Sequence, residues 1–298
     1  MGSMTIREIQ TDADYEAWRQ VRLAVYPGER TATVDELRSR ASPDRLLVLA
    51  ERDGDLVAAG SVMPSSIGDA GSAVPLVLPD VRRQGVGTQL LEYLTAEARR
   101  RGFPVAAANA DDPGSALFAQ RFGYAEVDRQ VEQVREIGDE PPVIPPPGVR
   151  LVTVAQRPEL WRAAYDTLAL PGVADMAVTA PMKLSLEEWE EEWLGEPAAT
   201  FFAVDELTGD LIGTAGLALD EDTPDRAENG FTTVRRDWRG RGIAATVKRA
   251  TLHWAAEQGL REVYTWTQRG NADMRRLNEH LGYVTRTVSI RFEKPLTS

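Results

Sequence analysis

Residues 239–244 read RGRGIA, and residues 82–87 read RRQGVG. An apolar run typical of a strand precedes each stretch, and apolar residues at helical spacing follow it. The first turn of a helix has unpaired N–H groups and the positive end of the helix dipole, which together favour an anion. Glycine or alanine allows an anion to approach the backbone closely, and arginines nearby add positive charge. Each stretch is therefore a candidate phosphate site between a strand and a helix.

Two better-known phosphate motifs do not fit these stretches. Both lack the third glycine of the dinucleotide fingerprint, and neither has the Gly-Lys-Ser/Thr of the P-loop. The sequence therefore predicts a pyrophosphate cradle of another kind. For one copy of the motif taken alone, an equally good interpretation is an ordinary helix start whose arginines lie in water and bind no phosphate.

The two motifs belong to an internal repeat. EAWR at 16–19 corresponds to ELWR at 159–162, and GDLV at 54–57 corresponds to GDLI at 209–212. Three matches in the same order indicate a tandem duplication. Five prolines within residues 139–148 predict a stiff linker. We therefore expect an N-terminal domain at 4–138, a linker at 139–148 and a C-terminal domain at 149–298.

Both halves predict the same order of elements. Strands are expected at 6–9, 45–51, 56–62 and 73–78 in the first half, and at 150–154, 200–205, 211–219 and 229–234 in the second. Helices are expected to begin near Val86 and Ile243 and to end before Gly102 and Gly259. This order predicts an α/β fold, with a mixed sheet flanked by helices in each half.

Composition excludes several classes of protein. The chain has 46 acidic and 34 basic residues, and its net charge of −12 disfavours nucleic acid and anionic membranes as partners. It has no cysteine and only two histidines, so we expect no disulfide, no catalytic thiolate and no metal site. No signal peptide or apolar run long enough to cross a bilayer is evident, which predicts a cytoplasmic protein.

The motif with its flanking strand and helix resembles the coenzyme A signature of the GNAT superfamily of N-acetyltransferases, here as a tandem pair. A second element of that family matches at NADM (271–274), LN (277–278) and LGY (281–283), with Met274 and Asn278 as departures. The resemblance implies a mixed, mostly antiparallel sheet in each domain. It also implies direct transfer of an acetyl group from acetyl-CoA to an amine, without a metal.

In that family the strand before the motif splays from its neighbour at a bulge, and its free amides bind the pantetheine arm. By this resemblance, the N–H of Val234 would stabilise the thioester oxygen. The coenzyme-binding residues implied in the C-terminal half are Val234, Arg235, Arg236, Arg239, Gly240, Arg241, Gly242, Ile243, Ala244 and Asn271. Their counterparts in the N-terminal half are Val77, Arg82, Gly85 and Gly87.

Glu228 is the candidate general base. Some family members carry a glutamate six residues before the valine of this strand, and counting back from Val234 gives Glu228, whereas the N-terminal half has Gly71. With a period of two, Glu228, Gly230, Thr232 and Val234 are expected to face one side. An ordinary solvated strand carboxylate is the alternative interpretation of Glu228.

The position of the family's general acid, a tyrosine, is taken by Asn278 and by Ala119 in the two halves. Asparagine can orient a thiolate but cannot protonate it, and a thiol leaving group with a pKa of about 8.5 can depart without a dedicated acid. His280, Tyr264 and Tyr283 are further candidates. We therefore predict a catalytic C-terminal domain and a non-catalytic N-terminal domain.

The acidic segment EEWEEEW at 187–193 has two tryptophans at i, i+4. It is an amphipathic helix or an acidic, aromatic edge for a cationic amine. The favoured function is an acetyl-CoA-dependent N-acetyltransferase that acts on a small-molecule amine. A non-catalytic acyl-CoA sensor and an acyltransferase with a longer acyl donor are the alternatives.

Overall fold

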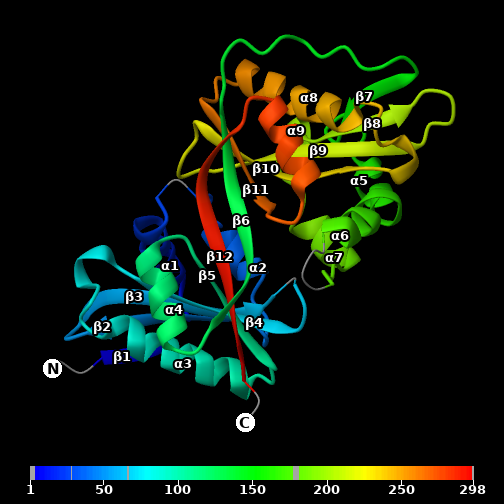
Figure 1. The fold of residues 1–298 in the computed structure, drawn as a ribbon. Helices are drawn as coiled ribbons and strands as arrows, with labels where there is room; N and C mark the ends of the chain where they lie inside the picture. Colours follow the sequence, from blue (N-terminus) through cyan, green and yellow to red (C-terminus); the bar gives the residue numbers. More distant parts are fainter. Residues whose placement is uncertain (1–3, 28, 66, 177–180, 297–298) are drawn as a thin grey trace. The chain divides into compact units, whose positions relative to one another are not determined.

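The structure, a computed structural model, describes residues 4–27, 29–65, 67–176 and 181–296 (Figure 1). The chain forms two compact units. Unit 1 contains Met1–Asp128 and Ser289–Ser298, and unit 2 contains Arg129–Val288. Within the described residues, no helix combines the length and the apolar character needed to cross a bilayer.

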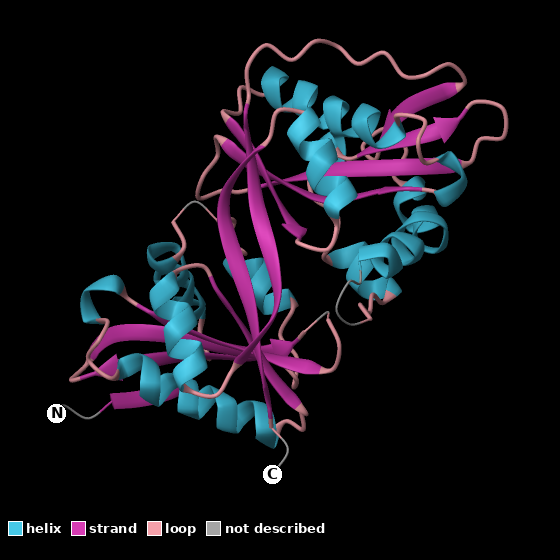
Figure 2. Ribbon diagram, viewed as in Figure 1, coloured by secondary structure: helices cyan, strands magenta, loops and turns pink. Residues whose placement is uncertain are grey.

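In unit 1, β1 (Met4–Glu8), β2 (Leu46–Arg52), β3 (Asp55–Pro64) and β4 (Ala70–Val77) pair antiparallel in sequence order. Strand β5 (Val105–Ala110) then pairs in parallel with the start of β4. The helices are α1 (Asp12–Val25), α2 (Val34–Ser39), α3 (Val86–Arg100) and α4 (Pro113–Arg121). Apolar residues of α3 pack on one face of this sheet and those of α1 pack on the other (Figure 2).

Unit 2 repeats this plan. Strands β7 (Val149–Thr153), β8 (Phe201–Asp205), β9 (Leu211–Leu219) and β10 (Arg226–Val234) pair antiparallel, and β11 (Glu262–Gln268) pairs in parallel with the start of β10. One face carries α8 (Ile243–Glu257) and α9 (Ala272–His280). The other face carries α5 (Glu159–Ala164), α6 (Leu170–Met176) and α7 (Leu186–Glu191). The predicted α/β fold, with mixed strand pairing and flanking helices in each unit, is confirmed.

Each unit is completed by a strand that follows the other repeat in the sequence. Strand β6 (Ala125–Glu136) follows the first repeat, but its residues 130–136 pair with β11 of unit 2. Strand β12 (Val284–Pro295) follows the second repeat, but its residues 290–295 pair with β5 of unit 1. The boundaries of the compact units therefore fall inside these two long strands. Residues 139–148 contain no helix or strand.

Two strands begin well before the residues that the sequence predicts. Strand β4 begins at Ala70 and β10 at Arg226, three residues before the expected starts. These first residues are small or charged and have weak strand preference, but they pair with β5 and β11.

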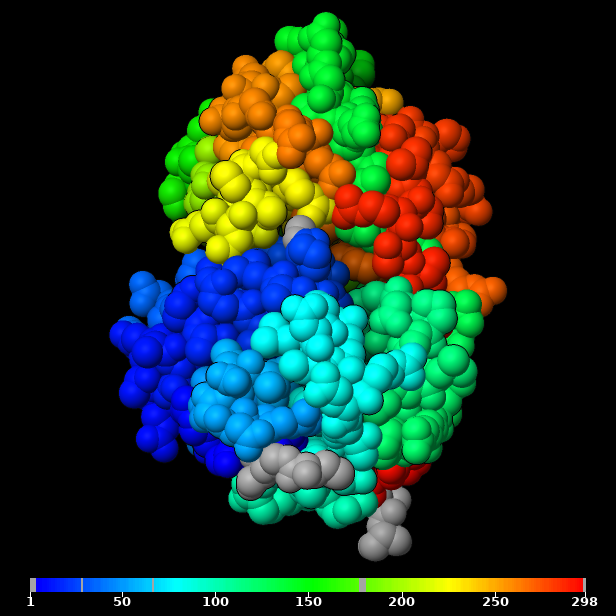
Figure 3. Space-filling view, turned by 90° about the vertical axis from the view of Figure 1, so that its left-hand side faces the viewer, coloured from blue at the N-terminus to red at the C-terminus, as the bar shows by residue number. Residues whose placement is uncertain are grey.

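In the space-filling view, the blue residues that include α1 and α2 form a continuous part of the surface of unit 1 (Figure 3).

Candidate functional site

The centre of the site is the strand β10, which parts from β11 part of the way along its length. The two strands pair only from Arg226 to Glu228, opposite residues 262–264. On its other side β10 stays paired with β9, with a bulge between Asn229 and Thr232. The splay and the bulge that the resemblance implied are therefore both present in unit 2.

The bulge changes which side chains share a face. The expectation that Glu228, Gly230, Thr232 and Val234 all face one side is wrong, because the extra residue reverses the alternation. Phe231, beyond the bulge, packs against Trp193 on the α7 side. Val234 packs with Ile243 of α8 on the opposite face. Glu228 alternates with Ala227 and with Asn229, which contact α8, and so lies on the α7 side with Gly230.

The same strand presents backbone amides at its unpaired edge. The amide of Arg235 donates to the carbonyl of Ile212 on β9 at 2.9 Å. Because hydrogen-bonded residues alternate along an antiparallel pair, Thr233 also bonds to β9. The amides of Thr232 and Val234 therefore point to the edge from which β11 has diverged.

Unit 1 lacks one of these two donors. Strand β4 leaves β5 after Ser72 and keeps one register with β3 from Gly71 to Val77. Leu78 donates to Val57 at 3.1 Å, which places positions 77 and 75 on the open edge. Position 75 is a proline, which has no N–H. Val77 alone offers a donor where unit 2 offers two.

The predicted phosphate cradle lies at the start of α8. Gly242 begins this 15-residue helix with φ 79°, and no side chain among the described residues caps it. A Cβ built on Gly242 would meet no heavy atom of the described chain within 4 Å, so the space before the helix is open. Gly240 also has a positive φ, 75°. The geometry fits an anionic group held by backbone N–H groups, as a coenzyme pyrophosphate requires.

The arginines around the cradle have ion-pair partners. Asp175 at the end of α6 binds Arg236 at 2.6 Å and also binds Arg239. The hydrogen bond from Arg236 is the main reason that the pKa of Asp175 lies below its ordinary value. The Nε of Arg239 donates to the carbonyl of Val234 at 3.1 Å. Asp175 therefore gathers two of the predicted coenzyme-binding arginines at the end of the strand.

Two further arginines flank the cradle. The guanidinium of Arg235 pairs with Asp237 at 2.8 Å and with Asp210 at 3.1 Å. The guanidinium of Arg241 lies 4.7 Å from the ring centre of Trp238. Arg241 and Gly242 are exposed, and Ala244 is half-buried behind them in the first turn of α8.

The cradle of unit 1 has a similar backbone geometry. Gly85 begins α3 with φ 85°, and the Nε of Arg82 donates to the carbonyl of Val77 at 3.1 Å. Gly87 follows in the first turn of α3. Arg83 has φ 63° at the position that corresponds to Gly240, a conformation that disfavours a residue with a Cβ.

Glu228 is half-buried at the base of the splay and lies in register with Ala218 on β9 and Tyr264 on β11. On the same face, the guanidinium of Arg226 lies 4.5 Å from the ring centre of Tyr264. Tyr264, one of the further acid candidates, is thus the neighbour of Glu228 across the strands.

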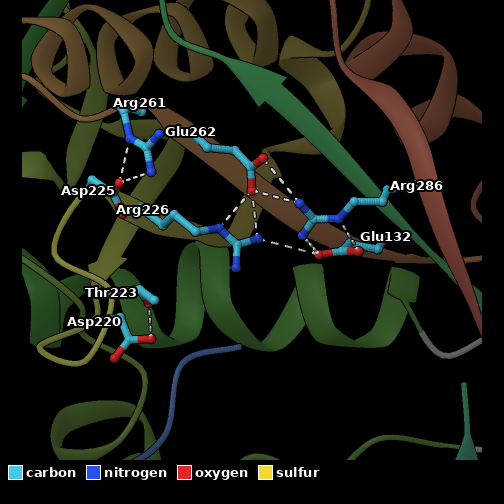
Figure 4. Close-up of polar contacts among 8 residues, drawn as sticks. All are labelled: Glu132, Asp220, Thr223, Asp225, Arg226, Arg261, Glu262 and Arg286. Atoms are coloured by element: carbon cyan, nitrogen blue, oxygen red, sulfur yellow. Dashed lines mark hydrogen bonds and ion pairs between the residues drawn. The ribbon is translucent and has the colours of Figure 1, made fainter. Parts of the chain in front are cut away.

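An ionic network holds the strands together just before the splay (Figure 4). Arg226 of β10 donates to Glu262 of β11 at 2.7 Å. Arg286 of β12 donates to Glu262 at 2.9 Å and to Glu132 of β6, also at 2.9 Å. Because Glu132 is buried, removing one member would leave a charge without compensation. The network therefore links β10, β11, β6 and β12 just before β10 and β11 part.

The second predicted catalytic residue, Asn278, lies away from Glu228. It is fully buried in α9 and donates to Gln133 at 3.0 Å and to Thr267 at 3.4 Å. Thr267 alternates with Trp266 and faces α9, so Asn278 and Glu228 lie on opposite faces of the sheet. The Oδ1 of Asn278 has no hydrogen-bond partner among the residues that the structure describes.

Three other predicted residues have clear positions. Asn271 is the N-cap of α9, and its Oδ1 accepts from the amide of Met274 at 3.2 Å. His280 is exposed at the end of the same helix. Tyr283 is buried, and burial raises its pKa. Within the described ranges, no three acidic or histidine side chains gather as a metal site requires.

Lys248 is a residue of the site that sequence reasoning missed. Its side chain is 1% exposed, its ammonium donates to Asn229 at the bulge, and it lies 5.1 Å from the ring centre of Tyr283. Asn229 in turn donates to the carbonyl of Gly216, opposite the bulge, at 2.8 Å. Burial lowers the pKa of Lys248 to about 7. Its i, i+4 spacing to Leu252 on the buried face of α8 was the available signal.

Comparisons with known proteins agree with this geometry. The sequence model of the acetyltransferase (GNAT) family matches residues 5–124 and 166–283. The chain is 28% identical over 265 residues to a mycothiol acetyltransferase of Mycobacterium sp. (strain JLS), covering 87% of this chain and 86% of that one. A mycothiol acetyltransferase of Nocardia farcinica is 27% identical over 98% of both chains.

Solved structures share the fold over the whole chain. A tandem GNAT protein from the clavulanic acid biosynthesis pathway superimposes with a TM-score of 0.78 at 20% identity, covering 99% of both chains. A GCN5-related N-acetyltransferase from Sphaerobacter thermophilus gives a TM-score of 0.76, also at 20% identity, covering 99% of this chain and 96% of that one.

Proposed function

Because the chain belongs to the acetyltransferase (GNAT) family, we propose that its C-terminal half transfers an acetyl group from acetyl-CoA to a small cationic amine. The family and the acetyltransferase relatives make the protein an N-acetyltransferase. Beyond this, we propose that the acceptor is a small cationic amine and that the C-terminal half catalyses the reaction. The relatives are named for mycothiol, a name that supports a small-molecule acceptor.

The open edge of β10 is the observation that carries the proposal. The amides of Thr232 and Val234 point to that edge, and the uncapped start of α8 lies at the end of the same strand. By strand register, unit 1 has Pro75 and Ser72 where unit 2 has Thr232 and Glu228. Unit 2 therefore has both edge donors and the carboxylate, whereas unit 1 lacks the second donor and the carboxylate.

Acetyl-CoA, when bound, would supply a thioester carbon for the amine to attack. Arg239–Ala244 would hold its pyrophosphate, with Arg235, Arg236 and Asn271 as further contacts. The N–H of Val234 would donate to the carbonyl oxygen as negative charge develops there. The acceptor ammonium has an ordinary pKa of about 10.4, so it must lose a proton before attack, and Glu228 would receive it. The new N–C bond then replaces the C–S bond.

The departing thiolate could be oriented by Asn278 or protonated by Tyr264. Asn278 uses its amide N–H groups on Gln133 and Thr267, so orienting a departing thiolate requires it to exchange these partners. Tyr264 lies in register with Glu228 and is the candidate that the geometry favours. Proton transfer from Tyr264 is not required if the thiolate departs unaided.

A cationic acceptor is supported by the surroundings of Glu228. A pocket of about 40 Å³ beside Gly230 is lined by Trp161, Trp193 and Phe231. That volume suits a compact group such as an ammonium. Aromatic faces attract such a cation, and α7, which carries four glutamates, ends two residues before Trp193 of the pocket wall.

A panel of amines with acetyl-CoA, read by a disulfide dye that detects free thiol, tests the proposal. The chain has no cysteine, so it adds no background signal. We expect thiol release with one class of amine, and a loss of about 100-fold in turnover for Glu228→Gln with unchanged coenzyme affinity. Glu221→Gln, at an exposed position before β10, is the matched control.

Two outcomes would contradict this assignment. Binding of acetyl-CoA without amine-dependent release for any amine class would favour the acyl-CoA sensor. Normal turnover of Glu228→Gln near neutral pH would remove Glu228 from the mechanism while leaving the acetyltransferase assignment in place.

A further inference from the structure

The helices α2 and α7 occupy corresponding places in the two repeats. Each begins with a capping box, formed by Thr33 with Glu36 and by Ser185 with Glu188. The tryptophans of the first helix correspond as well, Trp18 in unit 1 and Trp161 in unit 2. Counting from the two caps, the residues of unit 1 that correspond to Trp189, Trp193 and Leu194 are Leu37, Ala41 and Ser42.

In unit 2 these large side chains fill the space beside the first helix. Trp189 is fully buried and stacks on Trp161 with ring centres 3.8 Å apart. Each indole N–H donates to the other residue's carbonyl, at 2.9 and 2.8 Å. Trp193 packs against Trp189 with ring centres 6.0 Å apart.

In unit 1 the corresponding space is a pocket of about 350 Å³. Trp18, the counterpart of Trp161 in the sequence repeat, is buried here and donates to the carbonyl of Gly60 at 3.0 Å. Leu37 and Ala41 line the pocket where unit 2 has Trp189 and Trp193. The rest of the apolar wall is Ile9, Leu47 and Met63. The volume falls in the range of pockets that bind small molecules, and apolar side chains dominate its wall.

The charged residues at the ends of α2 and α7 also differ between the repeats. Glu190 and Glu192 follow the tryptophan of α7, whereas the corresponding residues of unit 1 are Arg38 and Arg40. Arg40 and Arg45 both line the pocket, and Glu8 is its one acidic residue. Arginine binds carboxylates through paired N–H groups, so this rim favours an anionic head group.

The pocket is separate from the cradle of unit 1. It reaches Met63, which pairs with Ser72, whereas the cradle follows Val77, which pairs with Ala58. The pocket wall belongs to the α1 side of the sheet, whereas α3, which begins at the cradle, packs on the other face. A ligand in this pocket therefore does not use the helix start at Gly85.

We propose that unit 1 binds a small carboxylic acid in this pocket, with its aromatic or aliphatic body beside Trp18 and its carboxylate at Arg40 and Arg45. The proposal is independent of which unit catalyses acetyl transfer. It explains why Leu37 and Ala41 replace two tryptophans while no other side chain that the structure describes fills the space.

Calorimetric titration of the full chain with 4-phenylbutyrate, phenylacetate and octanoate tests the proposal. Each acid is compared with its amide, and 4-phenylbutylamine is added as a cationic probe. We expect at least one acid to bind about tenfold more tightly than its amide, a difference of about 1.4 kcal/mol. Leu37→Trp should weaken that binding at least tenfold because it restores the side chain that fills unit 2.

Three variants complete the test. Ala41→Trp fills the same space from another position and serves if Leu37→Trp does not fold. Arg40→Gln should bring the acid down to the affinity of its amide, whereas Arg38→Gln, exposed and outside the pocket, should change nothing. Equal binding of acid and amide, tighter binding of the amine, unchanged binding in both tryptophan variants, or no binding of any acid would each overturn the proposal.

Discussion

Lys248 should make unit 2 less stable below neutral pH than its packing alone would allow. The ammonium is buried between Asn229 and the ring of Tyr283, and burial lowers its pKa to about 7. In the unfolded chain a lysine keeps its proton up to a pH of about 10.4. Between these values the unfolded state binds more protons, so the free energy of unfolding rises with pH across that window.

The size of the effect follows from the shift in pKa. At about 1.4 kcal/mol per unit, the shift costs about 5 kcal/mol below pH 7, and the cost disappears as pH rises toward 10. Lys248→Met removes the titrating group and leaves Asn229 without this donor, a loss of about 1–3 kcal/mol at every pH. We therefore expect Lys248→Met to be more stable than the natural chain at pH 6 and less stable above about pH 9.

Urea unfolding of both proteins between pH 6 and pH 9, followed by tryptophan fluorescence, measures this difference. Six of the seven tryptophans lie between residues 161 and 266, so the signal reports mainly on unit 2. Lys183→Met, which removes an exposed lysine, is the matched control and should not change the pH dependence. A stability difference between Lys248→Met and the natural chain that stays constant from pH 6 to pH 9 would refute the reasoning, because Lys248 would then be charged throughout.

Three further predictions concern coenzyme binding. Asp175→Asn removes a negative charge that pairs with Arg236 and Arg239. The variant should therefore bind acetyl-CoA about threefold more tightly at low salt, as measured by equilibrium dialysis. Weaker binding would mean that Asp175 orients the arginines. Thr232→Pro removes one edge N–H and should weaken acetyl-CoA binding about tenfold in calorimetry, whereas unchanged affinity would show that this amide does not bind the coenzyme. Gly242→Glu should lower turnover about 100-fold by repulsion of the pyrophosphate, while Gly85→Glu should leave it nearly unchanged; equal losses in both variants with the fold retained would show that unit 1 takes part in the reaction.

Periodicity and the repeated motif predicted most of the fold. The spacing of Val86 and Ile243 from the apolar residues that follow them located the starts of α3 and α8 correctly. Gly102 and Gly259 end these helices in the left-handed conformation, as expected. The repeated order of elements predicted the tandem α/β architecture because each element depends mainly on local sequence.

Long-range pairing was not predictable in the same way. Strands β6 and β12 have the composition of ordinary strands, and nothing in their sequences indicates that each pairs with β11 or β5 of the other repeat. The faces of the β10 side chains could likewise not be predicted from simple alternation, because the extra residue of the bulge moves Val234 to the face opposite Glu228. Lys248 was missed because a lysine is normally expected to be exposed to water, even where its spacing places it on the apolar face of a helix.

The two open strand edges differ in a way that bears on which unit uses its edge. An unpaired edge with exposed N–H groups is a liability, since another chain can pair with it, and proline is one way of blocking it. Unit 1 has Pro75 at this point of β4, whereas unit 2 keeps Thr232 and holds the adjacent bulge with Lys248 through Asn229. Keeping the donors, together with a buried lysine that costs stability below neutral pH, is reasonable only where the edge binds something. Pro75→Ala should therefore restore an edge donor in unit 1 without raising turnover, because Ser72, the counterpart of Glu228 by strand register, offers no carboxylate.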